Sequence, residues 1–137
     1  MFGWIRNKVA NFTDLDSCIT YLEYEVDSAA SLSAIKSIAF AMYMGILRIN
    51  NEGITATQFG NIYKEIKDDV MFKNSLRNCK DKDFATSYLI MAFFHSMDFA
   101  DTENGKSAMA KIFHFVGRCN EESVQGTLKK VYGLLGA

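Results

Sequence analysis

The sequence predicts an all-α domain, and three observations lead to this prediction. Its 137 residues contain no proline, whereas average usage would supply about seven. Because proline interrupts helix interiors, a chain without it can form long helices. Apolar residues make up 49% of the chain, too many for a disordered chain, and they recur at helical spacing. We therefore expect a single domain over residues 1–137, a compact bundle of five to seven helices around two apolar central helices at 34–49 and 84–100.

The N-terminal segment, residues 1–12, is amphipathic. Its apolar residues are Phe2, Trp4, Ile5, Val9 and Phe12, and its basic residues are Arg6 and Lys8. A helix that lies in a membrane interface normally has a richer basic face than this. We therefore expect the segment to dock on the bundle or on a second subunit, which leaves a homo-oligomer open, and not to insert stably into a membrane.

The first helix of the bundle is predicted over residues 14–29. Thr13 is a suitable N-cap, and Asp14 and Asp16 favour the positive end of a helix. One side of this helix is an apolar stripe that faces the core. The stripe consists of Leu15, Ile19, Leu22, Val26 and Ala29.

The helices at 34–49 and 84–100 are apolar on nearly every side, so both are expected to be buried at the centre of the bundle. Their shared core is predicted to contain Ile38, Met42, Ile46, Leu89, Phe93 and Met97. The first of the two includes Lys36, Ser37 and Arg48. We therefore expect it to be too short and too interrupted to cross a bilayer.

Turn and capping signals place the remaining helices. Gly53 can adopt the left-handed conformation that ends a helix, and Thr55-Ala56-Thr57-Gln58 forms a capping box for the next one. After the turn Asp101–Gly105, one helix runs through Met109 and Val116. A last helix is predicted over about 122–135, with Val124, Leu128, Val131 and Leu135 as its apolar stripe.

Composition excludes several classes of function. The formal net charge is −1, whereas a nucleic-acid-binding protein needs basic residues to neutralise phosphates. Cys18, Cys79 and Cys119 have no CxxC spacing, so we expect three reduced thiols. The chain also starts without the apolar run of a secretory signal. Together these features predict a cytoplasmic protein that does not bind nucleic acid.

No motif indicates an enzyme, so no catalytic residue, metal ligand or cofactor is predicted. The turn Asp101–Gly105 fits neither the spacing of a calcium-binding EF-hand loop nor that of a phosphate-binding loop. No HExxH or ExxH pair is present for zinc or di-iron. His95 and His114 lie among aromatic residues, which leaves open a haem- or small-ligand-binding helical protein.

The layout of the chain resembles the TerB-like tellurite-resistance proteins. The resemblance rests on Met1-Phe2-Gly3-Trp4 and on the turns at Asn50-Asn51-Glu52-Gly53 and Ala100–Gly105. It implies a helical stress-resistance protein that binds a divalent metal at its helix–helix turns. In that family the turns have Asp-Gly followed by acidic residues. The first turn of this chain departs from the pattern at Asn51 and Glu52.

The predicted helix 14–29 also carries the candidate functional surface. Opposite its apolar stripe it has an acidic row at helical spacing, formed by Asp16, Glu23 and Asp27, with Tyr21 and Tyr24 beside it. Tyrosine is enriched at binding hot spots, and an acidic field attracts a basic partner. The sequence therefore favours a non-enzymatic, intracellular protein-binding module, for example an immunity-protein or antitoxin-like inhibitor of a basic protein.

Overall fold

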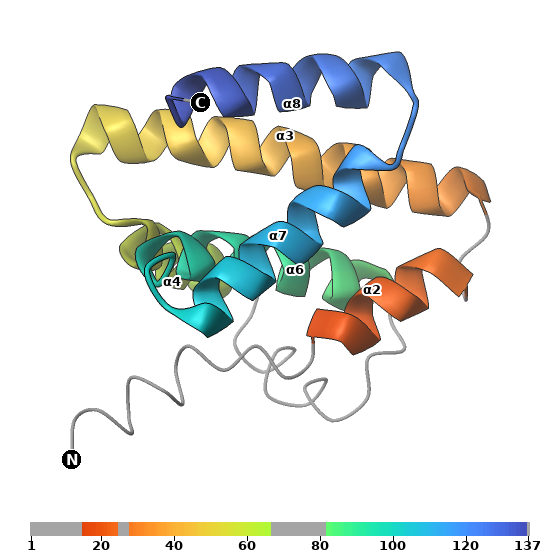
Figure 1. Ribbon diagram of the computed structural model, residues 1–137, viewed down its shortest axis with the longest axis horizontal. Helices are drawn as coiled ribbons and strands as arrows, with labels where there is room; N and C mark the ends of the chain where they lie inside the picture. The colour runs from red at the N-terminus through yellow and green to blue at the C-terminus, as the bar shows by residue number, and fades with distance from the viewer. Residues whose placement is uncertain (1–14, 25–27, 67–81, 137) are drawn as a thin grey trace.

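The computed structural model describes residues 15–24, 28–66 and 82–136. These residues form α-helices and no β-strand, which confirms the predicted all-α bundle (Figure 1). The helices are α2 (Leu15–Tyr24), α3 (Ser28–Glu52), α4 (Ala56–Ile66), α6 (Lys82–Asp98), α7 (Glu103–Gly117) and α8 (Glu122–Leu134). The N-terminal segment 1–12, for which docking is expected, and the predicted cap Thr13 lie outside the described residues.

The central helix of the bundle is α6 (Figure 1). α2, α3, α4 and α7 all pack against it, whereas α8 packs mainly along α3. α3 and α8 run in the same direction, because Lys36 pairs with Glu121 just before α8, and Lys130 in the second half of α8 lies over the ring of Tyr43. Because α3 packs against both α6 and α8, it forms a layer between them.

The core follows the predicted residues closely. Ile38, Met42, Ile46, Leu89 and Phe93 are all buried within one hydrophobic cluster. Met97 is only half-buried, because it lies in the last turn of α6, where the helix leaves the core. The centre is aromatic: the rings of Phe93 and Phe94 meet edge to face at 5.2 Å, a favoured geometry for such pairs.

The predicted helix 14–29 is divided between two helices. α2 ends at Tyr24, and α3 already begins at Ser28, six residues before the predicted start at 34. The Ser31 hydroxyl donates a hydrogen bond of 2.7 Å to the carbonyl of Leu22 in the last turn of α2. The bond supplies a donor to one of the last carbonyls of α2 and holds the start of α3 against it.

The capping residues behave as predicted. Gly53 has a φ of 68°, and its N–H donates to the Ile49 carbonyl at 2.9 Å, which ends α3. The Thr55 N–H donates to Gln58 at 2.9 Å, while the Gln58 N–H donates to the Thr55 hydroxyl at 3.0 Å. This reciprocal pair satisfies two donors at the start of α4 that would otherwise lack a helical partner.

α3 is not buried on every side, contrary to the prediction for 34–49. Phe40 is 59% exposed and Met44 is 45% exposed. The helix was also expected to be too short and too interrupted to cross a bilayer. Residues Ser31–Glu52 are in fact long and apolar enough by length and composition, with a mean hydropathy of 1.4. Core helices of water-soluble bundles meet the same criterion, and α3 packs against both α6 and α8.

Candidate protein-binding surfaces

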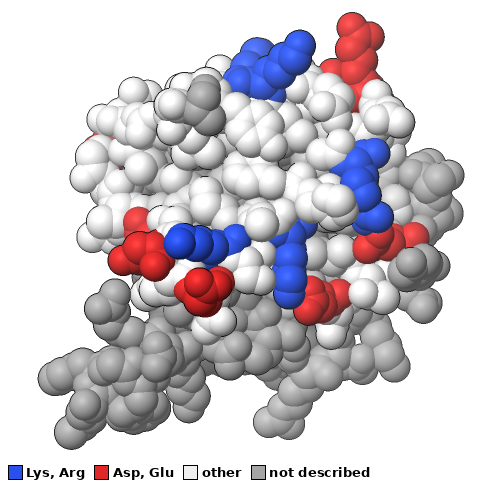
Figure 2. All heavy atoms as spheres, viewed as in Figure 1, with Lys and Arg blue, Asp and Glu red and all other residues white. Residues whose placement is uncertain are grey.

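The predicted acidic row on α2 faces one basic residue in α7 and another directly after it. The Lys111 Nζ lies 3.1 Å from the carboxylate of Asp16, and Arg118 forms an ion pair with Glu23. Figure 2 shows acidic and basic side chains next to one another along the lower edge of this face. The structure thus brings Asp16 and Glu23 to one edge of the bundle, but each already has a basic neighbour there.

The other predicted residues of that surface add little contact area. Tyr21 is half-buried and packs against the hydrophobic core, so only part of its ring is accessible to a partner. The side chain of Tyr24 and all of Asp27 lie outside the described residues.

A second surface lies on α3, outside the residues predicted from the sequence. Lys36, Phe40, Met44 and Arg48 follow one another at intervals of four residues and are all exposed. Residues four apart form an inclined ridge on the surface of a helix, so these side chains make one row that turns gradually around α3, which we call the α3 ridge. Two apolar side chains occupy its middle, and a cation stands at each end.

A hollow lies beside the α3 ridge, between α3 and α8. Its volume is about 380 Å³. It is lined by Lys36, Ser37, Ala39, Phe40, Ser123, Val124 and Thr127. The lining therefore combines an exposed aromatic ring with a cation and three hydroxyl groups, without a carboxylate.

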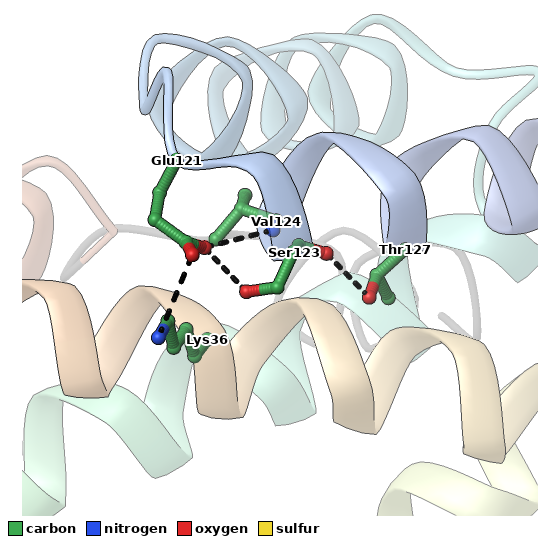
Figure 3. Close-up of polar contacts among 5 residues, drawn as sticks. All are labelled: Lys36, Glu121, Ser123, Val124 and Thr127. Atoms are coloured by element: carbon green, nitrogen blue, oxygen red, sulfur yellow. Dashed lines mark hydrogen bonds and ion pairs between the residues drawn. The ribbon is translucent and has the colours of Figure 1, made fainter.

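The first end of the α3 ridge is anchored at the start of α8 (Figure 3). The Glu121 carboxylate accepts hydrogen bonds from the Val124 N–H at 3.2 Å and from the Ser123 hydroxyl, and it lies 3.7 Å from the Lys36 Nζ. These groups lower the pKa of Glu121, with the Ser123 hydrogen bond as the largest cause. Glu121 is therefore held as the cap of α8.

The other end of the α3 ridge is supported by α4 and by α3 itself. The Arg48 Nε donates to the Glu52 carboxylate, one turn further along α3. The Arg48 guanidinium also lies 5.7 Å from the centre of the Phe59 ring, within the range of a cation–π contact. These two contacts hold Arg48 in place and leave its side chain 48% exposed.

The two histidines do not form a ligand site in the described part of the chain. The His95 Nε2 is buried without a hydrogen-bond partner, and a Cβ added at Gly60 would lie 2.8 Å from it. An iron atom bound to this nitrogen would need the space that α4 fills, so His95 does not fit an axial haem ligand. His114 is exposed and lines no described pocket.

The helix–helix turns have structural roles. The Thr102 hydroxyl accepts from the Gly105 N–H at 3.0 Å and so caps α7. A Cβ at Gly105 would lie 1.9 Å from the Phe99 carbonyl oxygen, which explains the glycine. The Asp98 carboxylate accepts from the Thr57 N–H at the start of α4. Among the described residues, no three His, Cys, Asp or Glu side chains gather as a metal site.

The structure contradicts the prediction of three reduced thiols. Cys18 is fully buried and disulfide-bonded, whereas Cys119 is free. Disulfides persist mainly in oxidising compartments. The thiols therefore no longer support the expected cytoplasmic location.

Comparison of the chain with protein families, curated proteins and solved structures finds no match. The resemblance to the TerB-like proteins gains no support from these comparisons.

Proposed function

We propose that this chain is a non-enzymatic protein-binding module that acts through the α3 ridge. The observation that supports this proposal is the exposure of Phe40 and Met44, 59% and 45%, in successive turns of α3. Neighbouring exposed apolar side chains often mark interaction sites. Aromatic side chains near the middle of such a site supply much of the binding energy.

An inhibitor of the immunity-protein or antitoxin type fits this arrangement. Such a protein needs only a firm surface that blocks its target, and the α3 ridge stands on a helix whose opposite side is buried against α6. Because the backbone beneath Phe40 is already ordered, little conformational entropy is lost when a partner binds.

The acidic row on α2 is the second candidate surface, and it would suit a basic partner. Lys111 and Arg118 offset the charge of Asp16 and Glu23, so the attraction for a basic partner is reduced. The TerB-like and haem-binding alternatives rank lower, since neither the turns nor His95 present a suitable set of ligands.

Site-specific photo-cross-linking in the cells that produce the protein tests this proposal. A photoreactive amino acid is placed at Phe40 or at Met44, with Ala110 as a matched exposed position on α7. We expect one discrete adduct from both ridge positions and none from Ala110. Excess unlabelled protein should compete with the adduct, and the Phe40→Asp variant should not.

Equal labelling at Ala110, or an adduct that Phe40→Asp still competes away, would exclude the α3 ridge as the binding surface. Circular dichroism of each variant checks that the fold is intact. The same experiment with the photoreactive group at Thr20, an exposed residue of α2, tests the alternative surface directly.

A further inference from the structure

We propose that the α3 ridge binds an acidic amphipathic helix of the partner protein. This inference rests on the proposed function and adds the chemistry of the partner. Along the ridge, Lys36 and Arg48 lie on either side of Phe40 and Met44. A complementary segment has apolar residues in its middle and carboxylates towards both ends.

The dimensions of the α3 ridge suit a helix. Lys36 and Arg48 are twelve positions apart, which is about 18 Å along a helix axis. A partner helix of about four turns spans this length, and its apolar anchors at intervals of three and four residues can contact Phe40 and Met44. The adjacent hollow of about 380 Å³ can take one large apolar side chain of that helix.

Both cations of the α3 ridge retain capacity for a partner's carboxylates. The 3.7 Å separation of Lys36 and Glu121 is an ion pair but is too long for a hydrogen bond. Arg48 uses its Nε for Glu52, and its terminal nitrogens donate no hydrogen bond to a carboxylate among the described residues. A guanidinium can bind a second carboxylate through those nitrogens.

One more cation lies next to the α3 ridge. Lys130 lies over the Tyr43 ring, 5.4 Å from its centre, and within the described ranges it has no carboxylate partner. Glu121 is held by the start of α8, so Lys130 adds positive charge beside the ridge. It favours an acidic partner, the opposite sign from the one predicted for α2.

Selection from a displayed helix library tests the charge preference. One amphipathic helical scaffold with a fixed leucine and tryptophan face is displayed, and its positions near the two ends are randomised among Glu, Gln and Lys. We expect selection on the wild-type protein to enrich Glu over Lys by about tenfold or more, which corresponds to about 1.4 kcal/mol. Higher salt should reduce that enrichment because it screens exposed charges.

A double charge reversal, K36E with R48E, is the decisive variant. It should invert the preference from Glu to Lys while a Lys111→Glu control on α7 leaves it unchanged. Equal enrichment of Lys and Glu on the wild-type protein, or an unchanged preference after the double reversal, would overturn the inference.

Failure of this inference is distinguishable from failure of the proposed function. If peptides are enriched on the wild-type protein and lost on Phe40→Asp without any charge preference, the α3 ridge binds helices and only the acidic partner is wrong. If Phe40→Asp selects the same peptides as the wild type, both proposals fail.

Discussion

α3 and α6 are the two most apolar long helices of the chain, yet they have opposite surroundings. α6 is enclosed by α2, α3, α4 and α7, and ten of its residues are buried. α3 is covered mainly by α6 and α8, and it leaves Phe40 and Met44 exposed. An apolar helix thus becomes part of the core only where neighbouring helices cover each of its sides. An apolar side that remains uncovered is available for a partner.

Truncation of one phenylalanine in each helix provides the strongest contrast. Phe93→Ala should lower the free energy of unfolding by about 3–5 kcal/mol, because it leaves a cavity in the centre of the bundle. Phe40→Ala should change it by no more than about 0.5 kcal/mol, as expected for an exposed site. Urea titration of both variants checks this. Similar losses for the two would mean that α3 and α6 are equally enclosed.

Added methyl groups distinguish the buried side of α3 from an open surface. A Cβ at Gly45 would lie 2.1 Å from the Phe94 ring, so Gly45→Ala should destabilise the protein by about 1–3 kcal/mol through overpacking. A Cβ at Gly126 of α8 meets no atom within 4 Å. Gly126→Ala should therefore stabilise its helix by up to about 1 kcal/mol. Thermal unfolding measures both, and stabilisation by Gly45→Ala would contradict the close contact between α3 and α6.

Acid should weaken the contact between α4 and α6. Burial lowers the pKa of His95 from 6.5, Lys64 lowers it further, and Asp98 acts in the opposite direction. The unfolded chain therefore binds more protons than the folded one, and stability should fall as the pH drops below about 6.5 towards the lowered pKa. Urea titrations at several pH values should show this dependence. It should be smaller in His95→Gln, and an unaltered dependence in that variant would exclude His95 as its source.

The ion pairs between α2 and α7 should have the smallest effect. Asp16 and Lys111 are in contact at 3.1 Å, but their side chains are 73% and 45% exposed. A double-mutant cycle with Asp16→Asn and Lys111→Met should give a coupling below about 1 kcal/mol at low salt, and less at high salt. A larger coupling that persists in high salt would show that the Asp16–Lys111 pair contributes more to stability than an exposed ion pair does.

Most of the fold could be predicted because it depends on local patterns. The capping box at Thr55, the glycine end of α3 at Gly53 and the apolar stripe of α8 each depend on residues a few positions apart. The break between α2 and α3 could not be predicted in the same way. It involves a hydrogen bond from Ser31 to a carbonyl nine residues earlier, and the serine is equally compatible with a continuous helix in the sequence.

The candidate site could be predicted only in part. The acidic residues of α2 were identified from their spacing, but the basic residues that face Asp16 and Glu23 are 95 positions away. Only the packing of α2 and α7 against α6 brings these acidic and basic residues together. The α3 ridge was hidden in the sequence because exposed Phe40 and buried Met42 belong to the same apolar run.

The sequence by itself determined the all-α class, the helix ends with capping signals and most residues of the central core. Helical periodicity, the lack of proline and local hydrogen bonding are properties of neighbouring residues, so they can be read from the chain. The tertiary structure alone decided which apolar side chains stay in contact with water and which charges are offset. Those outcomes depend on how many helices pack around each segment, and no local pattern specifies that number.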